Sequence, residues 1–136
     1  MTKRSRRAFL STSVLATAAT VVVDPLISVK DSSPLIHQVF FWLKNPGSIS
    51  DRKKLAEGLK KLSAIPQIKL LKIGFPAGTE KREVVDNSWD VSELMFFEDL
   101  KAQKAYQDHP LHQAFIQQYS YLWERVIVYD TLTMES

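Results

Sequence analysis

The stretch Leu35-Ile36-His37-Gln38-Val39-Phe40-Phe41-Trp42-Leu43 predicts a β-strand that is apolar on both of its faces. It is rich in aromatic and β-branched residues, which favour strands. Successive side chains of a strand point to opposite sides, so the face with His37 and Val39 is opposite to the face with Phe40 and Trp42. Because neither face is polar enough to meet water, we expect both to be covered.

A helix follows this strand, and its boundaries can be predicted from single residues. Ser50 can cap its start and Pro66 ends it. Leu55, Leu59 and Leu62 recur at i, i+4 and i+7 and give the helix its apolar stripe. Further strands are predicted at 68–75, 89–97 and 126–132. Further helices are predicted at 100–107 and from Pro110 onwards. The apolar stripe of the last helix consists of Leu111, Ala114, Phe115 and Leu122.

The order of these elements is β-α-β-β-α-β, which predicts an α+β, ferredoxin-like fold with a four-stranded antiparallel sheet. Both helices would cover the same face of that sheet. The other face carries Phe40 and Trp42, and it needs a cover that one copy does not supply. A second copy is the simplest cover, so we expect a homodimer through the sheet face, a dimeric α/β barrel.

The charge of the chain is concentrated in its first segment. The formal net charge is +3, and residues 1–24 alone account for it. The remaining residues carry 14 basic and 14 acidic side chains, and this neutral body argues against nucleic acid as a partner. The chain has no cysteine, which excludes disulfides and thiolate chemistry.

The first segment also has the features of an export signal. Arg6-Arg7 precedes an uncharged run from Leu10 to Val23, too short to span a bilayer. The arginine pair followed by Phe-Leu is typical of a twin-arginine signal. We therefore predict a signal peptide and short linker at 1–28, a folded domain at 33–134, an exported and periplasmic protein, and no stable membrane span after processing.

The three histidines of the chain are the candidates for chemistry. His109 and His112 lie around Pro110, one turn beyond Tyr106, and His37 lies on the first strand. A neutral imidazole is suited to removing a proton next to a carbonyl near neutral pH, and a tyrosine hydroxyl can stabilise the resulting enolate. The turn before Pro110 can bring His112 and Tyr106 toward one space, which His37 could enter from the sheet.

Residues 36–44, 105–112 and 126–130 resemble the stress-responsive dimeric α/β-barrel (Dabb) family, and the resemblance covers 35–132. One plant member closes a linear polyketide by an aldol reaction without a cofactor. Its base is the second histidine of a His-Pro-x-His element, assisted by a tyrosine six residues earlier. The resemblance implies His112 as catalytic base, Tyr106 as the assisting group and His37 as a pocket residue, with no cofactor. A third-strand histidine of that member is replaced here by Val91.

Each of these residues also has a structural interpretation. His109 is expected to cap the helix that begins at Pro110, and His112 or His37 could be a buried histidine bonded to the backbone. Tyr106 could be a core residue. Three imidazoles can hold zinc, but Pro110 separates two of them, so we expect no metal site. Glu93, if it faces inward, is a further polar group of the pocket.

Two functions therefore remain open. The first is an exported, cofactor-free lyase, cyclase or isomerase acting on a small hydrophobic carbonyl compound, with a histidine as general base. The second is a non-enzymatic stress-response dimer that binds a hydrophobic ligand. Haem or quinone chemistry would follow only from analogy with other barrels of this kind. The loop 74–87 is either a solvated connection or a lid over the pocket.

Overall fold

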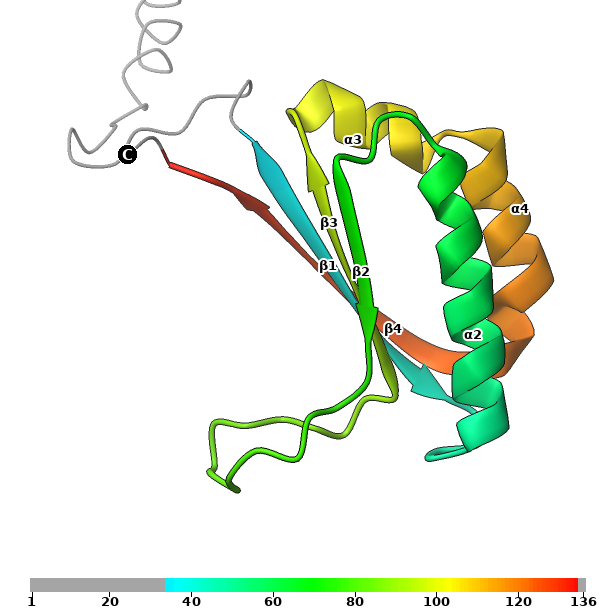
Figure 1. The fold of residues 1–136 in the computed structure, drawn as a ribbon, viewed down its shortest axis with the longest axis vertical. Helices are drawn as coiled ribbons and strands as arrows, with labels where there is room; N and C mark the ends of the chain where they lie inside the picture. The colour runs from blue at the N-terminus through cyan, green and yellow to red at the C-terminus, as the bar shows by residue number, and fades with distance from the viewer. Residues whose placement is uncertain (1–33, 135–136) are drawn as a thin grey trace, which may run out of the picture.

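The computed structural model describes residues 34–134, and the predicted signal peptide at 1–28 lies outside the described residues. The elements are β1 (Leu35–Leu43), α2 (Ile49–Lys61), η1 (Leu62–Ala64), β2 (Leu70–Gly74), β3 (Val91–Phe97), α3 (Leu100–Gln107), α4 (Pro110–Tyr119), η2 (Ser120–Leu122) and β4 (Trp123–Leu132). The strands form one antiparallel sheet in the order β2-β3-β1-β4. This is the predicted ferredoxin-like arrangement, with the helices together on one side of the sheet (Figure 1).

Several predicted boundaries are wrong by a few residues. The cap of α2 is Ser48 and not Ser50, because its hydroxyl accepts the amide N–H of Asp51 at 3.2 Å. β2 begins at Leu70, β3 at Val91 and β4 at Trp123, where we predicted 68, 89 and 126. The early start of β4 continues its pairing with β1 as far as Leu43, across a register shift next to Trp42.

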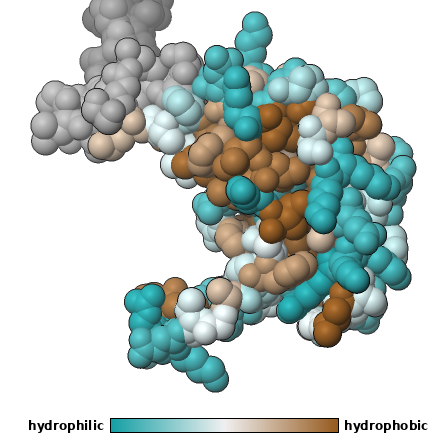
Figure 2. Space-filling model, in the orientation of Figure 1, coloured by the Kyte–Doolittle hydropathy of each residue, from teal (hydrophilic) through white to brown (hydrophobic). Residues whose placement is uncertain are grey.

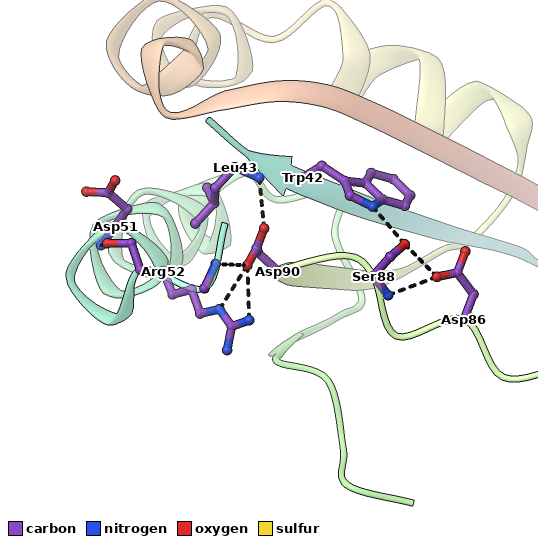
Figure 3. Close-up of polar contacts among 9 residues, drawn as sticks. Trp42, Leu43, Asp51, Arg52, Asp86, Ser88 and Asp90 are labelled. Carbon is purple, nitrogen blue, oxygen red and sulfur yellow. Dashed lines mark hydrogen bonds and ion pairs between the residues drawn. The ribbon is translucent and has the colours of Figure 1, made fainter. Parts of the chain in front are cut away.

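β3 begins two residues later than predicted, because the preceding residue, Asp90, directs its buried carboxylate to other segments of the chain. This carboxylate accepts the amide N–H of Leu43 at 3.0 Å, the amide N–H of Gly47 at 2.8 Å and the guanidinium of Arg52 at 3.0 Å (Figure 3). Burial alone would raise the pKa of Asp90, but these amides and the guanidinium hold it below its ordinary value. Asp90 therefore joins the end of β1 to the start of α2 and takes no part in the pocket.

The sheet has one buried face and one face without helices. On the helix side, the predicted alternation of β1 is confirmed, since Leu35, Val39 and Phe41 are each at most 4% exposed. The leucine stripe of α2 is buried against this face. The predicted stripe of α4 is only partly right: Phe115 is buried, but Leu111 is 42% exposed.

The other face of the sheet carries apolar and aromatic side chains that no described helix covers. Phe96 is 39% exposed there, and Phe40 lies edge-on to Tyr129 with ring centroids 6.1 Å apart. Figure 2 shows apolar surface gathered over β2 and on the side of the sheet away from the helices, whereas the outer side of α2 is polar. These aromatics are therefore not core residues of one copy, and their position agrees with the predicted interface.

The connection between β2 and β3 extends away from the body of the domain (Figure 1). All of its residues from Phe75 to Trp89 are exposed or partly exposed. None of them lines the cavity described below, so the structure does not place a lid at this loop. Within residues 34–134, no helix is long and apolar enough to cross a membrane.

Candidate functional site

A cavity of about 360 Å³ lies between the helix side of the sheet and the turn that joins α3 to α4. Its polar end is formed by residues of four elements, and the rest of its wall is mainly apolar. The lining residues are His37, Val39, Phe41, Glu93, Tyr106, Gln107, His112, Phe115, Ile116, Ser120, Trp123, Val126 and Val128. Val128 is 46% exposed, so the cavity opens toward the edge strand β4.

The three predicted site residues converge on this cavity. The ring of Tyr106 lies between the two imidazoles, with its centroid 5.7 Å from that of His37 and 4.7 Å from that of His112. The convergence follows from the local structure, since α3 ends at Gln107 and α4 begins at Pro110. The two-residue turn brings Tyr106 and His112 to the same end of the helix layer, above His37 on the central strand β1.

His112 is held in the protonation state that a base requires. Its Nδ1 lies 3.1 Å from the carbonyl oxygen of Gln107. A carbonyl only accepts, so Nδ1 carries the proton and Nε2 of the neutral ring carries the lone pair. Burial lowers the pKa of His112, and nearby His37 lowers it further, against the opposing effect of the Gln107 carbonyl. At neutral pH the ring is therefore neutral and Nε2 can accept a proton.

Tyr106 is suited to donate a hydrogen bond. Its side chain is almost fully buried, and it lines the cavity beside His112. Burial raises the pKa of the phenol, and the nearby carboxyl groups of Glu93 and Asp130 raise it further. The phenol therefore keeps its proton throughout the physiological range.

His37 lies between two acidic side chains. Its Nδ1 is 2.5 Å from Oδ1 of Asp130, and its Nε2 is 3.9 Å from Oε1 of Glu93. His37 and Asp130 are cross-strand partners in the register of β1 and β4, and such partners point to the same face. Sequence reasoning gave Asp130 no role, and only the strand register could have identified it.

Glu93 faces inward, as the sequence left open. Its side chain is 2% exposed, and burial raises its pKa from 4.5 to about 8. Its Oε2 is buried and has no hydrogen-bond partner among the described residues. A buried acid with one oxygen unpaired and a raised pKa, facing a cavity, is a candidate functional group.

His109 has the structural role that was predicted for it. It is the N-cap of α4, and its Nδ1 accepts the amide N–H of Leu111 at 3.0 Å. It does not line the cavity. Among the described residues, no three His, Cys, Asp or Glu side chains are grouped so that they could hold a metal ion.

The comparisons with known proteins agree with this architecture. Residues 35–132 match the family described as the stress responsive A/B barrel domain, or Dabb. The chain belongs to the Dabb family. No curated protein matches the chain significantly.

Solved structures of other family members and of fold relatives superpose on the Dabb domain. A Dabb family protein with a ferredoxin-like fold from Mesorhizobium loti is 25% identical, with a TM-score of 0.62 over 76% of this chain and 99% of that one. A hydroxynitrile lyase from Passiflora edulis is 18% identical, with a TM-score of 0.63 over 77% and 97%. A dimeric ferredoxin-like protein of unknown function from Thermobifida fusca is 18% identical, with a TM-score of 0.60 over 75% and 92%. At 18% identity the similarity shows the fold alone.

The buried carboxyl of Glu93 predicts an unusual dependence of stability on pH. Between about pH 4.5 and 8 the unfolded chain releases this proton while the folded protein keeps it, so stability falls as pH rises. Glu93→Gln removes the titration. We expect it to raise the free energy of unfolding at pH 7 by about 2–3 kcal/mol, with little gain at pH 4.

Chemical denaturation at several pH values measures this effect. Glu57→Gln, on the exposed side of α2, is the matched control and should change stability little at any pH. A variant Glu93→Gln that is less stable at pH 7 would show that Glu93 is ionised and paired with His37 in the folded protein.

Proposed function

We propose that this Dabb protein is a cofactor-independent lyase, cyclase or isomerase that removes a proton next to the carbonyl of a small hydrophobic compound. The observation that carries the proposal is the pairing of His112 with Tyr106 at one end of an apolar cavity. Both groups are in the state that the chemistry needs, a neutral imidazole and a protonated phenol. The fold is also used by a hydroxynitrile lyase from Passiflora edulis.

The first step would form an enolate. Nε2 of His112 takes the proton from the carbon next to the carbonyl, the electrons of that C–H bond move to the oxygen, and the hydroxyl of Tyr106 donates a hydrogen bond to it. The enolate then attacks a second carbonyl in a cyclase or is protonated at another carbon in an isomerase. In a lyase, Nε2 of His112 instead takes the hydroxyl proton of a β-hydroxy ketone, the C–C bond breaks to give an aldehyde and the enolate, and His112 then returns the proton to the enolate carbon.

His37 would act through the other two residues. Its hydrogen bond to Asp130 fixes the orientation of its ring, and its edge contact with Tyr106 holds the phenol in place. The presence of His37 also contributes to lowering the pKa of His112, which favours the neutral base.

A non-enzymatic function is the second candidate. The wall of the cavity is mainly apolar, and Ile116, Val126 and Val128 are each at least 36% exposed at its opening. These features suffice for binding a hydrophobic ligand in a stress-response protein. Catalysis separates the two candidates, since a binding protein would show the same affinity for a carbonyl compound but no proton transfer from it.

We also propose that the protein is a homodimer through the helix-free face of its sheet. Relatives from Thermobifida fusca and Bacteroides fragilis are described as dimeric, and both share this fold. The face carries apolar residues on both central strands, among them Phe40, Leu94 and Phe96. The helix-side cavity would then remain open in each subunit.

We propose further that residues 1–28 are a twin-arginine-type signal that directs the protein to the periplasm. The support is the pair Arg6-Arg7 ahead of an uncharged run of residues. A reporter fused to residues 1–28 should be exported, and substitution of both arginines by lysine should retain it in the cytoplasm. Export of the doubly substituted signal would contradict a twin-arginine route.

Deuterium exchange tests the enzymatic proposal without knowledge of the natural substrate. The methyl protons of acetophenone lie next to a carbonyl, and their replacement by deuterium in D2O can be followed by NMR. We expect the protein to accelerate this exchange. His112→Ala should lower the rate by at least about 100-fold, since the base is lost, and Tyr106→Phe by about 10- to 100-fold.

His109→Ala is the matched control, because it removes the neighbouring histidine that caps α4 and does not line the cavity. It should lower stability by about 1 kcal/mol and leave the exchange rate unchanged. Equal exchange by the unmodified protein and His112→Ala would contradict the role of His112. A large loss of stability in His112→Ala would point to a structural role instead.

The oligomeric state tests the proposed interface. A charge at the centre of the helix-free face should prevent pairing, because it would be buried there without a partner. We expect the unmodified protein to have the mass of a dimer in light scattering and Leu94→Asp to have the mass of a monomer. Leu111→Asp, on the exposed side of α4, should remain a dimer. A monomeric unmodified protein would be evidence against the interface.

A further inference from the structure

Glu93 is the one acidic side chain that lines the cavity, and the proposed proton transfer does not use it. It lies on the central strand β3, with Val39 and Ile73 as its neighbours in register. Both oxygens of a carboxyl group form hydrogen bonds, and a buried carboxyl without partners is costly. Oε2 of Glu93 nevertheless has no partner within residues 34–134. A bound ligand is therefore the natural partner for this group.

The groups around Glu93 leave its carboxyl uncharged near neutral pH. His37 faces it from β1 at 3.9 Å, with Asp130 of β4 behind that imidazole. Tyr106 and His112 complete the polar end from α3 and α4. No lysine or arginine lines the cavity, and burial raises the pKa of Glu93 to about 8. The acid form has an O–H donor, whereas the ionised form only accepts.

We propose that the carboxylic acid O–H of Glu93 donates a hydrogen bond to the uncharged oxygen of the ligand, and that this contact selects small aromatic or branched aliphatic ketones and aldehydes. The inference rests on the proposed function only for the kind of ligand, and it requires no turnover. In this arrangement Glu93 determines specificity, while His112 and Tyr106 act on the ligand.

The rest of the cavity agrees with a neutral ligand. Its walls are formed by the aromatic rings of Phe41, Phe115 and Trp123 and by the branched side chains of Val39 and Val126. A ligand carboxylate would lose its hydration in this cavity and would find no cation there. A hydrocarbon of the same shape would fit the walls but would leave the O–H of Glu93 unpaired.

Three probes of similar size separate these cases. Acetophenone has a carbonyl oxygen, α-methylstyrene has a CH2 group in its place, and benzoate is a carboxylate. Their dissociation constants for the full chain can be measured at pH 6.5 and 9.5 from the fluorescence of the protein, which has Trp123 in the cavity wall. We expect acetophenone to bind about 3- to 10-fold more tightly than α-methylstyrene at pH 6.5. This preference should weaken by at least about 3-fold at pH 9.5, where Glu93 is ionised and only Tyr106 still donates to the oxygen, and benzoate should bind at neither pH.

Two substitutions assign the effect to Glu93. Glu93→Gln keeps a neutral hydrogen-bond donor, so the preference for acetophenone should persist at both pH values. Glu93→Met keeps the length of the side chain and removes the donor, so the preference should be weak and independent of pH, as in the unmodified protein at pH 9.5. These opposite outcomes separate Glu93 from the other titratable groups of the cavity wall, His37, Tyr106 and His112, and from Asp130 behind His37.

A preference that is undiminished at pH 9.5 in the unmodified protein, or undiminished by Glu93→Met, would overturn the inference. Failure of all three probes to bind would overturn it as well, because the cavity would then not accept a small aromatic ligand. The deuterium exchange assay is a separate readout. Selective binding without exchange would leave the role of Glu93 intact and remove the proposed catalysis. Exchange without any dependence of binding on Glu93 would leave the proposed catalysis intact and remove the role of Glu93.

Discussion

The packing of the buried ring of Tyr106 fixes the positions of the sheet, α3 and α4 relative to one another. The ring lies 5.1 Å from the ring of Phe97, 5.7 Å from His37 and 4.7 Å from His112, measured between ring centroids. The side chain is 1% exposed. Because a close-packed ring has few alternative positions, these contacts fix the distance between an imidazole of the sheet and an imidazole of the helix layer. The geometry of the site is thus part of the packing of the core.

The same face of the sheet combines a hydrophobic core with polar groups that the core does not need. At one end Leu43 and Leu55 are fully buried, and Asp90 is surrounded by hydrogen-bond donors. At the other end His37 and Glu93 are buried, and Glu93 lacks a full set of partners. A buried acid without a full set of partners lowers the stability of the folded protein. Such a loss of stability is common at ligand-binding and catalytic sites. The helix-free face has the opposite character, since it exposes apolar side chains such as Phe96 and, in the described part of the chain, carries no buried acid.

The sequence predicted the order of the elements, the faces of β1 and the convergence of His37, Tyr106 and His112, because strand alternation and the His-Pro-x-His turn are local properties. Boundaries were less accurate. Asp90 lies outside β3 since its carboxylate binds the amides of Leu43 and Gly47, a contact between distant segments. The partnership of His37 with Asp130 depends on the register of β1 and β4, which no local pattern specifies. The empty hydrogen-bonding position of Glu93 could be seen only in the packed structure.

The central claim is that His112 is a neutral base whose Nε2 carries the lone pair. Nitrogen-15 NMR of the imidazole rings measures this directly, since protonated and unprotonated ring nitrogens have well-separated chemical shifts. The account predicts that His112 has its proton on Nδ1 at pH 7 and takes up a second proton only below the ordinary histidine pKa of about 6.5. A proton on Nε2 at pH 7, or a pKa above the ordinary value, would contradict it.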